Sequence, residues 1–436
     1  MESNFFDFLQ FEIINEQKVI MKNNCFIIEE TDRLAKLKKI NLVSSSKYDV
    51  LCIKLDNMEK QIGLLKNKIP IVDYLLIVKK ENKLIFVDCY TSWCGPCKIL
   101  SRNVFTNDAV ADFFNAHFIN AKFDMEKDRD GVILKKQFGI RFFPTLVFVD
   151  PVSGEVLHRM VGAGSPDWLL AGGKLAMDSD NNLRSLMKRY EKGERNGKFI
   201  RDYASVLFTA YVRDEAARIA CEYLDPLPVD SLLVQENWQM IKRVISDPLC
   251  PLLKRVMAER EKFYVAISQK EIDTKLEKVI NTAVEEFTNW NPKKKESFDE
   301  KGNQELIDYL KSIDFYAAPG GLACLYTATC VRKNDFRGML DKMDEALNYN
   351  LFRNGTEQDF IRDNLRKLIY CNDVSLIKEG IQRIDYFVDQ CTKALDKANL
   401  MRAKAFLQNK LVDSAGAEIS EKEAQRYMKM MREERN

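Results

Sequence analysis

The feature that most constrains the fold of this chain is an apolar run, Leu84-Ile85-Phe86-Val87-Asp88-Cys89-Tyr90, that leads directly into two cysteines three positions apart. An apolar run of this length is typical of a strand buried on both faces of a sheet. The pattern that follows, Trp93-Cys94-Gly95-Pro96-Cys97, predicts the start of a helix. A Cys-x-x-Cys pair at such a strand-to-helix transition indicates a dithiol redox site.

The same spacing could supply half of a zinc site, which would need two further ligands. The sequence has no second Cys-x-x-Cys, and its two histidines, His117 and His158, stand alone. We therefore expect no metal, and no cofactor other than a redox-active Cys94–Cys97 disulfide. A helix that begins near Cys94 would direct its N–H groups and positive dipole end at that sulfur, which favours the thiolate that attacks disulfides.

Composition narrows the class of protein. A chain of 436 residues suits two or three domains, and a net charge of +2 gives no electrostatic support for binding nucleic acid or an anionic membrane. No run of apolar residues is long enough to predict a membrane span, and no signal peptide is visible. Eleven scattered cysteines are typical of a reducing compartment. We expect the cytoplasm, with the bacterial periplasm or cell envelope as the alternative if a leader is missing from this chain.

Three segments differ in pattern. Residues 1–66 form an N-terminal extension that contains short candidate strands. We assign no function to it. Residues 67–177 alternate strand and helix patterns and predict an α/β domain with a mixed central sheet flanked by helices. After a polar linker at 178–182, residues 183–436 show apolar spacings of three and four, which predict an all-α region of helical hairpins stacked as a solenoid. A plain helical bundle is the alternative. Polar turns are expected at Arg213-Asp214-Glu215 and Lys333-Asn334-Asp335.

The middle segment resembles thioredoxin over about a quarter of the chain. Val87-Asp88 followed by Trp93-Cys94-Gly95-Pro96-Cys97-Lys98 is similar to that family's active-site strand and helix start. Phe138-Gly139-Ile140-Arg141-Phe142-Phe143-Pro144-Thr145 resembles its cis-proline loop, and Val161-Gly162-Ala163 resembles its glycine turn. The helical region after it is similar to tetratricopeptide repeats only in its expected paired helices, because it has no strict repeat period.

The chemistry of the site can be argued from three residues. Cys94, expected at the exposed start of a helix, would attack a substrate disulfide, and Cys97, expected to be more buried, would resolve the mixed disulfide. Asp88 is the one acid in an apolar strand, so burial should raise its pKa and suit it to accept a proton from Cys97. Lys122, on the neighbouring strand, is expected to modulate this acid.

The resemblance also implies residues that contact substrate: Trp93, Gly95, Pro96, Phe143, Pro144 and Gly162. A cis peptide before Pro144 would leave the preceding backbone able to pair with an extended substrate segment. The Gly95-Pro96 dipeptide implies a reducing poise. Phe142-Phe143 is bulkier than the pair usual in thioredoxin, so we expect a narrower, more apolar groove. Arg102 stands where the family has a kinking proline, so we expect a straighter helix.

These observations predict a thiol–disulfide oxidoreductase that reduces disulfides of protein substrates and is recharged by a dithiol or reductase electron donor. The helical region would select substrates or partners. One alternative is an interaction or scaffold protein, in which the helical array binds partners and the thioredoxin-like domain is a docking module. Another is an extracytoplasmic disulfide isomerase.

Overall fold

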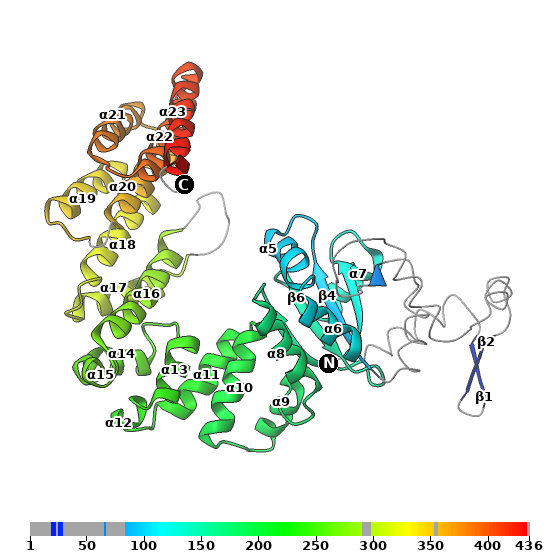
Figure 1. Ribbon diagram of the computed structural model, residues 1–436. Helices are drawn as coiled ribbons and strands as arrows, with labels where there is room; N and C mark the ends of the chain where they lie inside the picture. The colour runs from blue at the N-terminus through cyan, green and yellow to red at the C-terminus, as the bar shows by residue number, and fades with distance from the viewer. Residues whose placement is uncertain are drawn as a thin grey trace. The chain divides into compact units, whose positions relative to one another are not determined.

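The computed structural model describes residues 83–289, 298–352 and 356–433, together with the backbone of three short strands, β1 (Val19–Lys22), β2 (Cys25–Ile28) and β3 (Leu65–Lys66). Strands β1 and β2 pair antiparallel, so the predicted extension contains β-structure. The remainder of residues 1–66 lies outside the described part of the chain. Two compact units divide the molecule, Met1–Val244 and Ile245–Asn436 (Figure 1).

A mixed sheet forms the centre of the first unit. Its strands lie in the order β3-β5-β4-β6-β7, where β4 is Leu84–Tyr90, β5 is Phe118–Asp124, β6 is Thr145–Val149 and β7 is Val156–Val161. Strand β5 runs parallel to β4, whereas β6 is antiparallel to both β4 and β7. The predicted α/β class with a mixed sheet is therefore confirmed, and its strands begin where the apolar runs of the sequence begin.

Both faces of this sheet are buried. Because successive side chains of a strand point to opposite faces, Val87 and Cys89 pack on one side and Phe86 on the other. The first face packs against helix α7 (Arg129–Gln137) through Leu134. The second face packs against three helical segments, namely α5 (Gly95–Ile99) with its continuation η1 (Leu100–Val104), α6 (Asp108–His117) and α8 (Pro166–Met177). Asp88 falls on the second face, with Phe86.

The helix after the cysteines is not regular. It passes at Leu100 from α-helical into π-helical hydrogen bonding, and Arg102 lies within this π-helical turn. The hydrogen-bond ladder is therefore irregular although Arg102 is not a proline, because the N–H of Phe105 bonds to the carbonyl of Leu100 five positions back. The expectation of a straighter helix stays a prediction. π-Helical turns of this kind are frequent at functional sites.

Five further helices belong to the same compact unit as the sheet: α9 (Leu183–Glu191), α10 (Gly197–Thr209), α11 (Arg213–Leu224), α12 (Val229–Leu232) and α13 (Gln235–Val244). The predicted linker at 178–182 is an ordered turn, in which the Asp178 carboxylate accepts hydrogen bonds from the backbone of Asp180 and Asn181. By contact, therefore, the first unit extends beyond the predicted boundary at 177 and includes the first helices of the predicted 183–436 region.

Helix α9 packs on the edge strand of the sheet. The N–H of Leu183, its first residue, donates to Nδ1 of the buried His158 on β7 at 3.3 Å. Arg184 forms an ion pair with Glu155 at 3.0 Å. Burial lowers the pKa of His158 to about 4, so the ring stays neutral and can accept this hydrogen bond at neutral pH.

The turn between α10 and α11 has a left-handed residue, Tyr211, with φ of 62°. The N–H of Val212 closes this turn on the carbonyl of Leu207, and Arg213 begins α11. The polar turn predicted at residues 213–215 was therefore two residues late: these residues form the first turn of α11. The turn predicted at Lys333-Asn334-Asp335 is confirmed.

The second unit is entirely helical in its described residues, as predicted for this part of the chain. Between residues 323 and 424 the apolar spacings pack into a core cluster that includes Leu340, Leu365 and Leu407. No helix in the described residues of either unit combines the length and apolar character needed to cross a membrane. The helices of this unit are α14 (Pro251–Ala258), α15 (Arg260–Ala266), α16 (Gln269–Thr288), α17 (Glu300–Ser312), α18 (Ala318–Arg332), α19 (Phe336–Asn348), α20 (Thr356–Lys367), η2 (Leu368–Tyr370), α21 (Val374–Gln390), α22 (Ala394–Lys410) and α23 (Ser414–Glu433).

Candidate active site

Cys94 and Cys97 form a disulfide at the start of α5, with their Cα atoms 5.3 Å apart. Cys94 caps the helix: its Sγ accepts a hydrogen bond from the N–H of Cys97 at 3.1 Å. Both residues are only 3% exposed, so the expectation that Cys94 is more exposed than Cys97 was wrong for the disulfide form. The disulfide holds the Cys94 sulfur over the first turn of the helix, where the backbone N–H can reach it.

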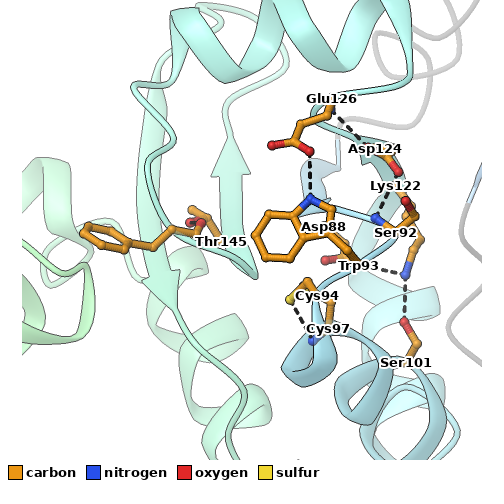
Figure 2. Close-up of a disulfide and its surroundings, with 11 residues drawn as sticks. Asp88, Ser92, Trp93, Cys94, Cys97, Ser101, Lys122, Asp124, Glu126 and Thr145 are labelled. Carbon is orange, nitrogen blue, oxygen red and sulfur yellow. Dashed lines mark hydrogen bonds and ion pairs between the residues drawn. A yellow bond between two sulfur atoms is a disulfide. The ribbon is translucent and has the colours of Figure 1, made fainter. Parts of the chain in front are cut away.

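Asp88 lies in the middle of the sheet and is 1% exposed. Its register neighbour on the parallel strand β5 is Lys122, whose Nζ lies 2.8 Å from Oδ2 (Figure 2). Desolvation by burial raises the pKa of Asp88 above its ordinary value, and the charge of Lys122 opposes this rise only in part. The predicted direction of the shift is confirmed, as is the proximity of Lys122.

Lys122 connects this acid to the helix that carries the cysteines. Its Nζ donates to Oγ of Ser101 in η1 at 2.7 Å (Figure 2). It also lies 4.4 Å from the ring centre of Tyr90. Asp88 points to the sheet face on which α5 and η1 pack. The sheet thus places a buried carboxylate with a raised pKa on the face that packs against the helix of the dithiol. Ser101 was not predicted, because nothing in its sequence context distinguishes it from a surface serine.

Trp93 covers the approach to the disulfide and is 66% exposed. Its indole N–H donates to Glu126 in the β5–α7 loop at 2.8 Å (Figure 2). At the end of β5, just before this loop, Asp124 accepts a hydrogen bond from the N–H of Ser92 at 3.1 Å. Sequence reasoning missed Asp124 and Glu126, since both contacts join segments more than thirty residues apart. Gly95 and Pro96 are exposed next to Trp93, which leaves an accessible surface on this side of the disulfide.

The Phe143–Pro144 peptide bond is cis, as expected. The Pro144 carbonyl accepts a hydrogen bond from the N–H of Gly162 at 2.9 Å, and Gly162 has φ of 102°, a conformation that favours glycine. The Phe143 ring lies edge-on to Trp93, with ring centres 6.0 Å apart. The structure therefore joins Trp93 to Phe143 and Pro144 to Gly162; their contact with substrate stays a prediction.

Other cysteines of the described residues differ from this pair, because they are free thiols whose pKa is raised by burial. Cys89 lies in the core on the opposite face of its strand from Asp88, and burial raises the pKa of its thiol well above the ordinary value. Burial also raises the pKa of Cys324, to about 12, and Cys324 and Cys330 are not bonded to each other. High pKa values keep a thiol protonated and unreactive. Among the described residues, no cluster of three or more histidine, cysteine or acidic side chains could hold a metal ion.

Comparison with known proteins places this domain among its relatives. A family model described as a thioredoxin-like domain matches residues 73–172. Thioredoxin H4 of Arabidopsis thaliana is 36% identical to this chain over 89 residues, which make up 20% of this chain and 68% of that protein. Thioredoxin of Chlorobaculum thiosulfatiphilum is 33% identical over 83 residues, 19% of this chain and 69% of that protein.

Among solved structures, the chain is similar to a Bacteroides thetaiotaomicron protein described as a candidate disulphide-isomerase. That protein is 45% identical in sequence, and the match covers 28% of this chain and 98% of the other, with a TM-score of 0.26. All of these matches cover a minor part of this chain, so what they show concerns the domain that carries the disulfide.

Proposed function

The chain belongs to the thioredoxin family through this domain, and on that premise we propose that it reduces disulfides of other proteins with the Cys94–Cys97 dithiol. The observation that carries the proposal is a disulfide at a helix start, above a buried carboxylate whose pKa is raised. No cofactor beyond the dithiol takes part in this proposal.

The reaction proceeds in two exchanges. The Cys94 thiolate attacks one sulfur of the substrate disulfide, so a Cys94–substrate disulfide forms and the other substrate sulfur leaves as a thiolate. The Cys97 thiolate then attacks Cys94, which forms the Cys94–Cys97 disulfide and releases the second substrate sulfur. Two electrons pass from the dithiol to the substrate. A dithiol or a reductase must return them, in a compartment such as the cytoplasm that keeps thiols reduced.

Asp88 serves the second exchange. Cys97 must lose its proton before it can attack, and a carboxylate with a raised pKa binds a proton more readily than an ordinary aspartate. The positive charge of Lys122 opposes the rise in the pKa of Asp88 and so favours the ionised carboxylate, which can accept a proton. Lys122 also connects this carboxylate to Ser101. Asp88 is thus the proton acceptor, and Lys122 is a positioning residue.

The loop before Pro144 would hold the substrate. Among the described residues, none forms a hydrogen bond with the main chain of Phe143, so its N–H and carbonyl can pair with an extended substrate segment. The exposed indole of Trp93 and the ring of Phe143 provide the apolar contact on the two sides of that segment.

The test is turnover of a protein disulfide with dithiothreitol as electron donor. Cys94→Ser should abolish turnover, whereas Cys97→Ser should accumulate the mixed disulfide. Full activity of Cys94→Ser would refute the proposal and favour a docking role for the domain. The reduction potential gives the direction of electron flow. A value near about −270 mV is expected for a reductase, and one near about −120 to −180 mV would instead indicate disulfide formation or isomerisation.

A further inference from the structure

A groove of about 410 Å³ lies next to the loop that carries Pro144. One wall belongs to the thioredoxin-like domain and includes Phe142, Phe143 and Trp168. The opposite wall belongs to the helices that follow the domain and includes Tyr211, at the turn between α10 and α11. Both walls lie in one compact unit, so the groove is a feature of the fold of that unit.

The two walls contact each other at one end of the groove. The rings of Phe142 and Tyr211 lie 4.2 Å apart, centre to centre. The left-handed conformation of Tyr211 directs the chain sharply from α10 into α11 at this point. Phe142 is 46% exposed and Tyr211 36%, so both rings keep an open face toward solvent although they contact each other. The helices therefore extend the surface that begins at the substrate loop.

Two arginines give the helical wall its charge. The Arg213 guanidinium lies over the rings of Tyr211, at 4.0 Å, and Phe208, at 5.0 Å. The Arg243 guanidinium donates to the hydroxyls of Ser205 and Thr209, at 2.8 and 2.9 Å. Neither arginine forms an ion pair with a carboxylate of the described residues. These contacts fix the position of the guanidinium groups and leave their charge unneutralised.

The contrast with Arg218, on the same helix as Arg213, shows that this is a local property. Arg218 forms ion pairs with Glu215 and Glu222, at 2.6 and 2.9 Å. Acidic residues are therefore available on α11, yet they pair with the arginine that lies away from the groove. A guanidinium that is held in place and lacks a carboxylate is a binding site for one, because Arg and carboxylate match in geometry as well as charge.

We infer that this groove binds an acidic segment of the protein substrate, close in sequence to the disulfide cysteine, with a substrate carboxylate on Arg213 or Arg243 and a neighbouring apolar side chain against Phe142. The inference rests on the proposed reductase function and names the class of substrate that the helical region selects. The net charge of the whole chain is only +2, so its electrostatics give no reason to expect a polyanion in place of an acidic peptide.

The test compares peptide disulfides that differ only in a glutamate or a glutamine placed within a few residues of the cysteine. With the full-length protein, kcat/KM should be roughly fivefold higher for the best-placed glutamate peptide than for its glutamine counterpart, as for a charge pair that is partly exposed. The double substitution Arg213→Gln, Arg243→Gln should remove this preference, so that the ratio of kcat/KM between the glutamate and glutamine peptides falls to about one. The control of equal charge is the double substitution Lys174→Gln, Lys192→Gln, at two exposed lysines of the same unit, and it should retain the preference.

The outcomes separate the two proposals. If the wild-type protein reduces neither the peptides nor the neutral hydroxyethyl disulfide, the reductase function is wrong. If it reduces both peptides at equal rates, or if the double variant keeps the preference, the acidic-substrate inference is wrong. A measurement on the wild-type protein alone avoids any effect of folding. Raising the ionic strength from about 0.02 M to about 0.5 M shortens the Debye length to about 4 Å, which screens exposed ion pairs and should sharply reduce the preference for glutamate.

Discussion

Two cysteines of this molecule begin helices in the same manner, one in each unit. Cys94 caps α5 and accepts a hydrogen bond from the N–H three residues on, at 3.1 Å, and Cys250 caps α14 and accepts one from the N–H of Leu253, at 3.4 Å. A proline stands in the first turn of each helix. The capping geometry of a sulfur at a helix start is therefore shared by a redox site and by a region with no sign of one.

The difference lies in what surrounds each sulfur. Three residues after Cys94 there is a second cysteine, whereas the matching residue after Cys250 is Leu253. The ionisable group of the first region is the acid Asp88, with a raised pKa, and that of the second is Lys275, whose pKa is lowered to about 8 by burial. Capping stabilises a thiolate in either place, but repeated turnover also requires a resolving thiol and a group that accepts its proton.

The largest expected effect comes from removing the resolving thiol, which makes the helix start at Cys94 like the one at Cys250. Cys97→Ala leaves one capping sulfur with no resolving thiol. We expect attack on the substrate to persist and turnover to fall by roughly 10³-fold, because the mixed disulfide cannot be released. Mass spectrometry of the trapped complex checks this. The matched control, Cys250→Ser, should leave turnover unchanged, and a comparable loss in that control would contradict the distinction.

The next effect concerns the buried lysine. Lys275 is 7% exposed and donates to the carbonyl of Ile245. Since its folded pKa of about 8 lies below the unfolded value, burial of the charge costs stability below about pH 8, and that cost vanishes above about pH 10.5. Lys275→Met should raise the free energy of unfolding by about 2 kcal/mol at neutral pH, after the loss of one hydrogen bond. Urea denaturation at two pH values measures this; turnover should not change.

A third effect tests the acid. Asp88→Asn removes the proton acceptor, so release of the mixed disulfide should slow by roughly tenfold or more. In the wild type, this step should quicken as pH rises through the raised pKa of Asp88, because the carboxylate must be ionised to accept a proton. Stopped-flow measurement across pH should show that component lost in Asp88→Asn. The same variant should unfold less readily at neutral pH, since an ionised carboxylate with a raised pKa opposes folding. An unchanged pH profile would exclude Asp88 as the acceptor.

The smallest expected effect is a loss of stability at acidic pH that occurs in the first unit and not in the second. Both histidines of the sequence lie in the first unit, and His158 is 1% exposed with a pKa of about 4. Because the unfolded ring titrates near pH 6.5, stability should fall progressively as pH drops from about 6.5 toward 4, by about 1 kcal/mol at about pH 5.5. Hydrogen exchange should detect this loss in the first unit, and His158→Gln should abolish it. An equal loss in the second unit would assign the effect to other groups.

The strands and the dithiol could be predicted because their signals are local. The apolar run at Leu84–Tyr90 and the cysteine spacing after it locate one strand and one helix start, and the parallel pairing of β4 with β5 then brings Lys122 beside Asp88. The loop before Pro144 and the glycine at residue 162 were predicted from the resemblance to thioredoxin. Each could be recognised because its short motif is itself similar to the corresponding motif of that family.

Contacts between distant segments had no such signal. The bond from Trp93 to Glu126 joins two loops, and neither residue belongs to a periodic pattern. The π-helical turn at Leu100–Val104 looks in sequence like a continuous helix. The packing of α9 on β7 includes a hydrogen bond to His158. In the sequence this histidine has no other potential ligand or catalytic residue near it, so no contact could be predicted for it. The groove between Phe142 and Tyr211 lies between a loop of the domain and a turn between later helices, so it had no local signal either.

The contact between Leu183 and His158 also has a consequence for synthesis on the ribosome. Strand β7 forms one margin of the sheet, and α9 and α10 contact it. Until these helices emerge, the nascent domain presents an open strand margin to which another extended chain can add. Residues 183–209 pack on this marginal strand, so we expect a chain whose translation halts before them to aggregate more readily than the full-length protein.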